Sequence, residues 1–471
     1  MRGRKRRVRW LLIIPVGAVL RGRKRRVRWL LIIPVVILCA VIAVFAPRLE
    51  GESPKIAVEG FRPYLGADCG FTVTVSDKGS GLRHVKIVLQ AGGRDFVLSD
   101  DVLDKQGPKA AGPVMSKKYK VRVEPRRMGI PDGPAVLSIS AEDLSLRNWM
   151  HGNLAKVEKN DTRKPDVSVL SRHHYVTRGG SGLVVYRVME KGTTHGVQVG
   201  DNFFPGYDGL FDDETVCLAF FAVDYRQDTD TPMFVVATDR AGNRSKAGFY
   251  YRIRPKKFAE DTIRISDGFL NMKMPEFDAP GDSKTPIEKF VWINSVQRGK
   301  DTKKIANLCR VSDSAIYWKG PFLRFPNSAR RAGFGDKRQY IYNGRTVSHA
   351  VHMGVDLASV AHSPVPAANN GKIVFCGRIG IFGKTVVIDH GCGLFSMYSH
   401  LSSITVHPGR MVARGDYIGT SGMTGLAGGD HLHFGMMIHG VFVDPVEWWD
   451  GTWIENNITS KIEAAGVKFE S

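Results

Sequence analysis

The sequence predicts a mainly β protein with four folded parts behind an N-terminal transmembrane helix. Three observations lead to this fold class. The 471 residues exceed one compact domain, the 51 glycines and 23 prolines imply many turns, and short alternating apolar runs recur through the middle of the chain. The expected parts are a basic tail at 1–28, an anchor at 29–46, β-sandwich modules at 47–164 and 165–256, a partly helical connector at 257–325 and an antiparallel β domain with a C-terminal tail at 326–471.

The positive charge is concentrated in the basic tail. Residues 1–28 contain twelve lysines and arginines and no acidic residue, so the net charge of +21 leaves +9 for the remaining chain. A high pI alone favours a nucleic-acid partner, but this distribution removes most of that support. We therefore expect no nucleic-acid binding. The smaller surplus suits an anionic polymer such as a cell wall.

A fifteen-residue segment occurs twice near the N-terminus, as Arg2–Val16 and Arg21–Val35. The second copy continues without a charge from Trp29 to Ala46, which is long enough to cross a hydrocarbon core of ~30 Å. Pro47 follows directly and disfavours signal-peptide cleavage. Because positive flanks stay in the cytoplasm, we expect a single-pass protein of the inner (cytoplasmic) membrane, with its body periplasmic or otherwise extracytoplasmic. Whether the duplication is real or a start-site artefact stays open.

The two β-sandwich modules share one sequence plan. Each opens on a proline-led alternating strand, Pro54–Val58 in the first and Pro165–Val169 in the second. Each closes on a polar turn, and Asp239–Asn243 resembles the ending of bacterial immunoglobulin-like modules. We therefore expect two immunoglobulin-like sandwiches, which are candidate surfaces for envelope protein partners.

The connector and the cysteines carry weaker signals. Amphipathic spacing at 287–296 and 303–311 predicts two short helices. The five cysteines beyond the anchor are odd in number and widely spread, so no disulfide framework is expected. Hairpin register would set Cys376 opposite about Thr385 rather than Cys392, although a Cys376–Cys392 bridge stays open. Buried free thiols are the default expectation.

Histidines cluster in the last domain. His352 and Asp356 form an H-x-x-x-D motif, and His431 and His433 form an H-x-H motif whose alternation sets both rings on one face of a strand. His400 lies between the two motifs. Two histidines and one carboxylate leave a fourth position for water, which is typical of catalytic rather than structural zinc sites.

The C-terminal domain resembles the lysostaphin/LytM-type zinc metallopeptidases, which cut peptide cross-links of bacterial peptidoglycan. The resemblance covers about residues 334–449. It rests on a first strand at Phe334–Arg338, on HMGVDLAS at 352–359, on MYSHLS at 397–402, on the glycine-rich segment 415–425, on HLHFGM at 431–436 and on Val443-Asp444-Pro445. The implied fold is a small antiparallel β domain with a groove across its sheet.

This resemblance implies the roles of the site residues. His352, Asp356 and His433 match the ligands of one zinc ion per catalytic domain. His400 and His431 match the pair that activates the zinc-bound water and stabilises the oxyanion. Zinc lowers the pKa of bound water towards neutrality, and a histidine is suited to moving the proton.

Several nearby residues receive other interpretations. His362 and Ser363 stand where the family usually has Gly-Thr, which adds bulk near the groove without removing a ligand. His349 is interpreted as a loop histidine rather than a competing ligand, and His390 and His407 as structural or solvated. Tyr398 is interpreted as a core residue rather than one that orients substrate. Segment 422–429 is interpreted as a flexible wall of the groove.

The leading hypothesis is a membrane-anchored zinc metalloendopeptidase (EC 3.4.24 type) with peptidoglycan as its partner. The alternative is a non-catalytic or masked wall-binding regulator of other hydrolases. A third is an adhesin or envelope scaffold that acts through its sandwiches. Because all five site residues are present, the sequence favours the enzyme.

Overall fold

The computed structural model describes residues 33–40, 42, 52–103, 114–145, 150–278, 280–281 and 285–466. It divides into two compact units, 1–162 and 163–471. The predicted basic tail lies outside the described residues, and of the predicted anchor only the helical residues 33–40 and 42 are described. Within these ranges, no helix combines the length and apolarity that a membrane crossing requires.

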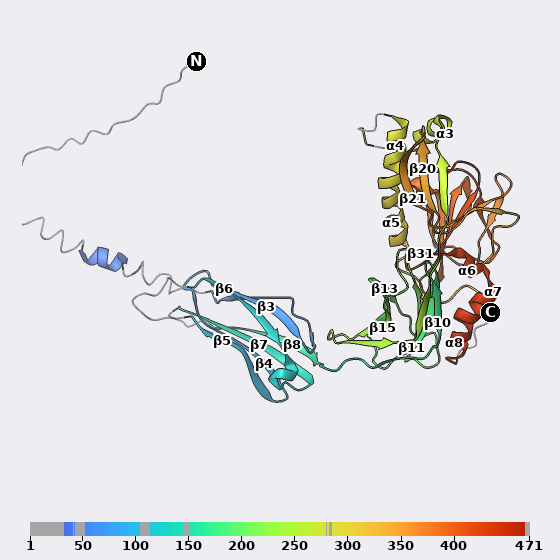
Figure 1. Cartoon of the computed structure of the whole chain (residues 1–471). Helices are drawn as coiled ribbons and strands as arrows, with labels where there is room; N and C mark the ends of the chain where they lie inside the picture. Colours follow the sequence, from blue (N-terminus) through green and yellow to red (C-terminus); the bar gives the residue numbers. More distant parts are fainter. Residues whose placement is uncertain are drawn as a thin grey trace, which may run out of the picture. The chain divides into compact units, whose positions relative to one another are not determined.

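The first unit is a β-sandwich of two sheets, with strand orders β1-β3-β6 and β2-β8-β7-β4-β5. Its elements are β1 (Lys55–Glu59), β2 (Tyr64–Leu65), β3 (Cys69–Ser76), β4 (Leu82–Ala91), β5 (Arg94–Val102), β6 (Ser116–Val123), α2 (Pro125–Met128), β7 (Gly133–Asp143) and β8 (Met150–Asn160). Alternate residues of β3 and β7 are buried between the sheets, as the period-two pattern predicts. Figure 1 shows this unit in blue to cyan.

The second unit begins with a further set of short strands, arranged as β14-β11-β9, β13-β12-β15-β16 and the parallel pair β10-β17. Their bounds are β9 (Val167–Val169), β10 (His174–Thr177), β11 (Ser181–Val188), β12 (Thr194–Val199), β13 (Asn202–Pro205), β14 (Val216–Ala222), β15 (Met233–Thr238), β16 (Arg244–Gly248) and β17 (Tyr251–Arg254). These strands share one hydrophobic core with residues 318–462. The predicted domain boundaries within this unit stay predictions.

A strand and a helical segment follow, and Figure 1 draws the helices α3, α4 and α5 of this segment in yellow. They are β18 (Glu260–Arg264), α3 (Asp267–Lys273), η2 (Met274–Glu276), α4 (Pro286–Trp292), η3 (Ile293–Gln297) and α5 (Arg298–Leu308). The helix predicted at 287–296 is confirmed, and it begins at a complete capping box on Thr285. The second helix starts at 298 instead of 303, because the π-helical turn η3 joins it to α4 without a break.

The C-terminal region is built on one long sheet, in the order β19-β22-β30-β26-β25-β24-β28, with β31 beside β30. Two smaller sheets, β18-β20-β21 and β23-β29-β27, accompany it, and short helices end the chain. The strands are β19 (Ala329–Ala332), β20 (Lys337–Tyr342), β21 (Arg345–Val351), β22 (Val355–Ala358), β23 (Pro364–Pro366), β24 (Gly371–Ile379), β25 (Gly383–Gly391), β26 (Leu394–Leu401), β27 (Ser403–Ile404), β28 (Met411–Val412), β29 (Tyr417–Thr420), β30 (Leu432–Ile438) and β31 (Val441–Val443). The helical elements are η4 (Gly380–Phe382), α6 (Pro445–Trp449), α7 (Gly451–Ile454), η5 (Glu455–Thr459) and α8 (Ser460–Glu463).

One local expectation is wrong in part, and another is confirmed to within one residue. The strand predicted at Phe334–Arg338 is a turn up to Asp336, whose carboxylate accepts the backbone N–H of Gly333 at 2.6 Å. Gly335 has a φ of +83°, and a Cβ there would lie 2.1 Å from the ring of Phe258, so the chain turns at a glycine. The residue opposite Cys376 is Val386, one position from the expected Thr385, so Cys392 is not its partner. All six cysteines are free thiols, as expected for five of them.

Candidate metal centre

Three elements bring His352, Asp356 and His433 together. Asp356 and His433 are directly paired on the antiparallel strands β22 and β30, so their side chains share one face of the sheet. His352 approaches from the segment that joins β21 to β22. Gly354 makes this approach feasible, because a Cβ there would lie 2.7 Å from His433 Nε2.

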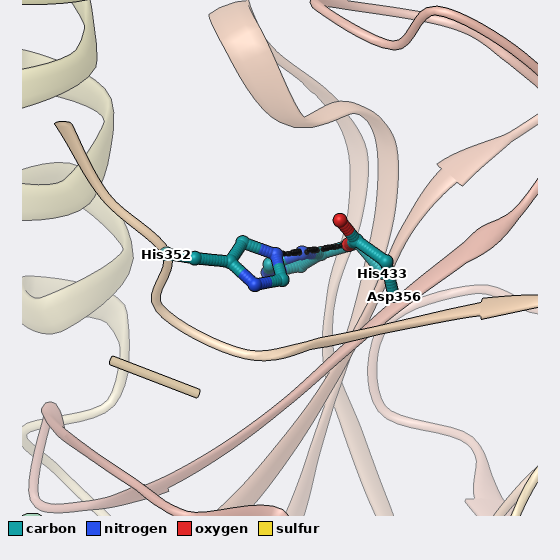
Figure 2. A group of neighbouring side chains, drawn as sticks. All are labelled: His352, Asp356 and His433. Atoms are coloured by element: carbon teal, nitrogen blue, oxygen red, sulfur yellow. Dashed lines mark hydrogen bonds and ion pairs between the residues drawn. The ribbon is translucent and has the colours of Figure 1, made fainter. Parts of the chain in front are cut away.

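The three side chains point at one another (Figure 2). Asp356 Oδ1 lies 2.9 Å from His352 Nε2 and 2.9 Å from His433 Nδ1, and the two nitrogens lie 3.0 Å apart. All three residues are buried. An ion centred above a triangle of this size reaches each atom at the ~2.0–2.2 Å that zinc takes with imidazole nitrogen and carboxylate oxygen.

The hydrogen positions also favour a cation. His352 Nδ1 lies 2.8 Å from the carbonyl of Gly333, which only accepts, so its proton is there and Nε2 carries a lone pair. Burial lowers the pKa of His433 to about 4, so its ring is neutral and brings one proton. Three acceptor atoms therefore meet with at most one hydrogen among them. Because a divalent cation satisfies all three lone pairs, the donor set fits a metal ion.

Arg338 orients the carboxylate of this group. Its Nη2 donates to Asp356 Oδ2 at 2.8 Å, which leaves Oδ1 to face the two imidazoles. The charge of the Arg338 guanidinium at this distance stabilises the ionised form of Asp356. The aspartate is therefore ionised, as a metal ligand must be.

His400 and His431 lie beside the triad, with ring centroids 4.8 Å apart. The ring of His400 is also 5.8 Å from that of His433. His431 precedes β30, and its Nε2 lies 3.5 Å from Asp356 Oδ1. The structure thus brings all five predicted site residues together.

A β-bulge sets the direction of His400. Ser399 and His400 on β26 face the single residue Thr385 on β25, because the register shifts between Lys384 and Val386. His400 has a φ of +63°, which is uncommon for a residue with a side chain and is found at functional sites. Its Nδ1–H donates to the carbonyl of Thr424 at 2.8 Å, so Nε2 carries a lone pair.

The surroundings shift the pKa values of these two histidines in opposite directions. Burial, followed by the charge of protonated His431, lowers the pKa of His400 well below its ordinary value. Burial also acts to lower the pKa of His431, but the hydrogen bond and charge of Asp356 raise it overall. One ring is therefore held neutral and the other favours its proton, which is the arrangement of an acid–base pair.

The five residues line a cavity of about 940 Å³. Residues 426–428 form part of its wall, as predicted for segment 422–429. Its other walls come from the helical segment, from β20 and β21, and from a loop at 224–226. The predicted groove is therefore bordered by several elements besides the strands that carry the triad.

The remaining histidines lie outside the triad. His349 is on β21 at the cavity wall, so it is a strand rather than a loop residue. His362 is exposed, with Nδ1 3.2 Å from Ser402 Oγ. His390 is buried, with Nδ1 2.7 Å from the carbonyl of Asn370. The buried hydroxyl of Tyr398 accepts the N–H of Ala368, which confirms it as a core residue.

Sequence reasoning missed three contributors to the site. Arg338 lay within the motif but received no role, since an arginine in a strand is usually a solvated charge. The carbonyls of Gly333 and Thr424 fix the two histidine tautomers, and no side-chain pattern reveals a carbonyl. Only Arg338 had a readable signal, as a cation shortly before the H-x-x-x-D motif.

Comparisons with known proteins agree with this geometry. Residues 350–445 match Peptidase family M23. The chain is 41% identical over 96 residues to the DD-carboxypeptidase/endopeptidase Mpg of Neisseria meningitidis, covering 20% of this chain and 22% of that protein. It is 34% identical over 130 residues to the peptidoglycan DD-endopeptidase ShyB of Vibrio cholerae, covering 27% and 30%.

Solved structures include the catalytic domain of lysostaphin from Staphylococcus simulans, at 32% identity and a TM-score of 0.23, covering 26% of this chain and 92% of that one. The chain spans less than a third of the length of the two curated relatives named above. The matched residues nevertheless include the whole metal triad, together with His400 and His431. The C-terminal part of this chain is a Peptidase family M23 domain, at residues 350–445.

Proposed function

We propose that this protein is a zinc metalloendopeptidase that hydrolyses peptide cross-links of bacterial peptidoglycan. The observation that carries the proposal is the convergence of His352 Nε2, Asp356 Oδ1 and His433 Nδ1 within 3.0 Å of one another. The substrate class is taken from relatives named as peptidoglycan DD-endopeptidases.

The three ligand residues would hold the ion, and Arg338 would orient the Asp356 carboxylate toward it. When bound, zinc supplies a Lewis acid that polarises the scissile carbonyl and lowers the pKa of coordinated water. Arg338 keeps Asp356 ionised and correctly turned for binding. The Gly333 carbonyl keeps the lone pair of His352 on Nε2, where the ion would lie.

His400 and His431 would move protons. His400 presents a lone pair on Nε2 because its Nδ1–H is bound to Thr424, so it suits the role of general base. His431 Nδ1–H donates to the Gly429 carbonyl at 2.8 Å, which fixes the ring with Nε2 toward the cavity. Its protonated form would donate to the oxyanion or the leaving amine.

The location is part of the proposal. A peptidoglycan substrate requires the catalytic domain to lie outside the cytoplasm, which agrees with an anchor at 29–46 and a cytoplasmic N-terminus. The β-sandwiches would then present the domain to the wall. The alternative of a non-catalytic regulator requires an incomplete site, whereas the described residues hold a complete ligand and acid–base set.

The test measures metal content and peptidoglycan digestion by the full-length protein. We expect about one zinc per chain, release of peptides, loss of metal in His433→Ala, and in His400→Ala retained metal with activity reduced roughly 10²–10⁴-fold. His407→Ala is the matched control, because His407 is an exposed histidine away from the cavity. Zinc binding without digestion of any wall type would favour the regulator, and absence of zinc would exclude the enzyme.

A further inference from the structure

The helical pair formed by α4, η3 and α5 supplies one wall of the metal-site cavity. These elements span residues 286–308, outside the segment that matches the peptidase family. Figure 1 shows them beside β20 and β21, and Figure 2 shows a helix of the same colour next to the triad. Any group that this wall presents to substrate therefore lies outside the segment that the family model matches.

This wall is fixed to the peptidase sheet. Asp301 on α5 is 4% exposed, and its carboxylate accepts the backbone N–H of Ile381 at 2.8 Å. The neighbouring Gly380 allows the approach, because a Cβ there would lie 2.0 Å from Asp301 Oδ2. Phe382 of the same turn lies 5.7 Å from His433, measured between ring centroids. The helix is thus held directly beside a ligand residue.

Arg298 points from this wall into the cavity, and one edge of its guanidinium is held in place. Nε and Nη2 donate to Asn294 Oδ1 at 3.1 and 2.7 Å, and Nε lies 3.2 Å from the Asn294 carbonyl. Asn294 is fixed in turn by its bond to Ser348 Oγ at 2.8 Å. Asn294 lies in the π-helical turn η3, and such turns are frequent at functional sites.

The charge of Arg298 has no ion-pair partner among the described residues. Asp301 and Asp356 act on it through space, but both carboxylates bond to other groups. Burial lowers the pKa of this guanidinium, although arginine stays charged in proteins. Arg298 is half-buried, and a guanidinium partly removed from water without a counter-ion is costly, so the site favours an incoming anion.

The rest of the cavity strengthens this preference. Arg264 and Lys303 also line it, and neither forms an ion pair within the part of the chain that the structure describes. Arg338 is committed to Asp356, and Asp224 to Arg226. The charged side chains that remain available to bind a ligand are therefore cationic.

We propose that Arg298 binds a free carboxylate of the peptide substrate, so that the helical wall selects acidic peptides for cleavage at the metal centre. The inference deepens the proposed function and rests on it. A planar guanidinium with one edge fixed presents its other N–H groups to two carboxylate oxygens. The carboxylate has two sources in a peptidoglycan stem peptide, the C-terminal residue or the side chain of a diamino diacid at the cross-link.

Paired substrates distinguish these sources. One pair is a stem pentapeptide ending in D-Ala-D-Ala and its C-terminal carboxamide. The other is a cross-linked dimer containing diaminopimelate and the same dimer amidated on that carboxylate. Full-length wild type, Arg298→Gln and Arg298→Lys are compared by kcat/KM and, in metal-free protein, by calorimetric Kd. Lys300→Gln is the matched control, since Lys300 is exposed on the same helix and does not line the cavity.

We expect wild type to favour the carboxylate over the amide roughly 10- to 100-fold in one pair, as charge-assisted hydrogen bonds do. Arg298→Gln should lose this preference while retaining its zinc and its melting temperature. Arg298→Lys should keep part of the preference, and Lys300→Gln all of it. The pair that shows the preference identifies the source of the carboxylate.

Equal use of carboxylate and amide by wild type in both pairs would overturn the inference. So would a preference that survives in Arg298→Gln. If no peptide is cleaved, the proposed function fails, but the Kd values of the metal-free protein still decide whether Arg298 selects carboxylates. If Arg298→Gln has a lower melting temperature than wild type, the Arg298→Lys variant is used as the test instead. A full preference for the carboxylate over the amide in Arg298→Lys would contradict the bidentate role of Arg298.

Discussion

The two regions that begin at Pro54 and Pro165 open on the same strand pattern but pack differently. The first forms its own core, whose described members lie between residues 56 and 157. The second has no such separate core in the described chain, because its buried residues join those of the peptidase region in one cluster. A shared sequence plan therefore does not imply a shared structural role.

The difference is visible in single strands. On β7, buried and half-buried residues alternate, as expected for a strand with one face on a core. On β14, Val216–Ala222, every residue is buried. Its sequence is apolar throughout, which is typical of a strand covered on both faces. The second face of β14 is the one that meets the peptidase region, against β30 and β31.

Aromatic and polar contacts reinforce this junction. Phe220 on β14 lies 6.5 Å from Trp318 and 6.1 Å from Trp448, measured between ring centroids. The backbone N–H of Ser181 donates to the Glu447 carboxylate at 2.9 Å. The approach is so close that a Cβ on Gly180 would lie 2.3 Å from Glu447 Oε1. The region at 165–254 is thus structurally joined to the region that contains the Peptidase family M23 domain.

The largest expected effect comes from where the chain is cut. A fragment 163–471 keeps the shared core intact, so we expect it to fold and bind zinc like the full chain. A fragment 326–471 exposes the surfaces that covered Phe220 and its neighbours, so we expect it to aggregate. Circular dichroism and zinc content distinguish the two fragments. A soluble, zinc-binding fragment 326–471 would show that the peptidase region is an independent domain.

Point substitutions sharpen the same comparison. Phe220→Ala should destabilise the second unit by about 3–5 kcal/mol and weaken zinc binding, because β14 supports the strand that carries His433. Leu137→Ala, in the buried face of β7, should destabilise the first unit by about 2–5 kcal/mol and leave zinc affinity unchanged. Denaturant titration with a zinc readout measures both. Equal loss of zinc affinity in the two variants would contradict the separation.

The sequence predicted most of the chemistry and less of the architecture. The motifs containing His352, His400 and His433 could be recognised because ligand types recur at short spacing on strands. The junction at Phe220 could not be assigned. An apolar strand predicts that both of its faces are covered, but it does not identify the residues that cover them. Arg298 was also missed, because its place in the cavity wall depends on a long-range packing of α5 against Ile381. Long-range contacts of this kind leave no local periodicity.

The smallest expected effect is the contribution of Glu447 to the pH dependence of stability. Burial raises the pKa of this carboxyl from 4.5 to about 8, so the folded chain binds a proton there that the unfolded chain releases. Its contribution to stability is complete below pH ~4.5 and is lost as the pH rises through about 8, at up to ~1.4 kcal/mol per pH unit. Glu447→Gln keeps an uncharged acceptor for Ser181 and removes the titration.

The stability difference between wild type and Glu447→Gln isolates this group from the buried histidines, which titrate in both proteins. We expect the variant to gain on wild type steadily between pH 5 and pH 8, as the linkage relation requires for a raised carboxyl pKa. Glu455→Gln, at an exposed glutamate of the same helical tail, should show no such trend. A stability difference between wild type and Glu447→Gln that stays constant with pH would mean that water reaches this carboxylate. The junction would then be less tightly packed than the shared core implies. The region at 165–254 would then resemble the first sandwich in being more independent of the peptidase region.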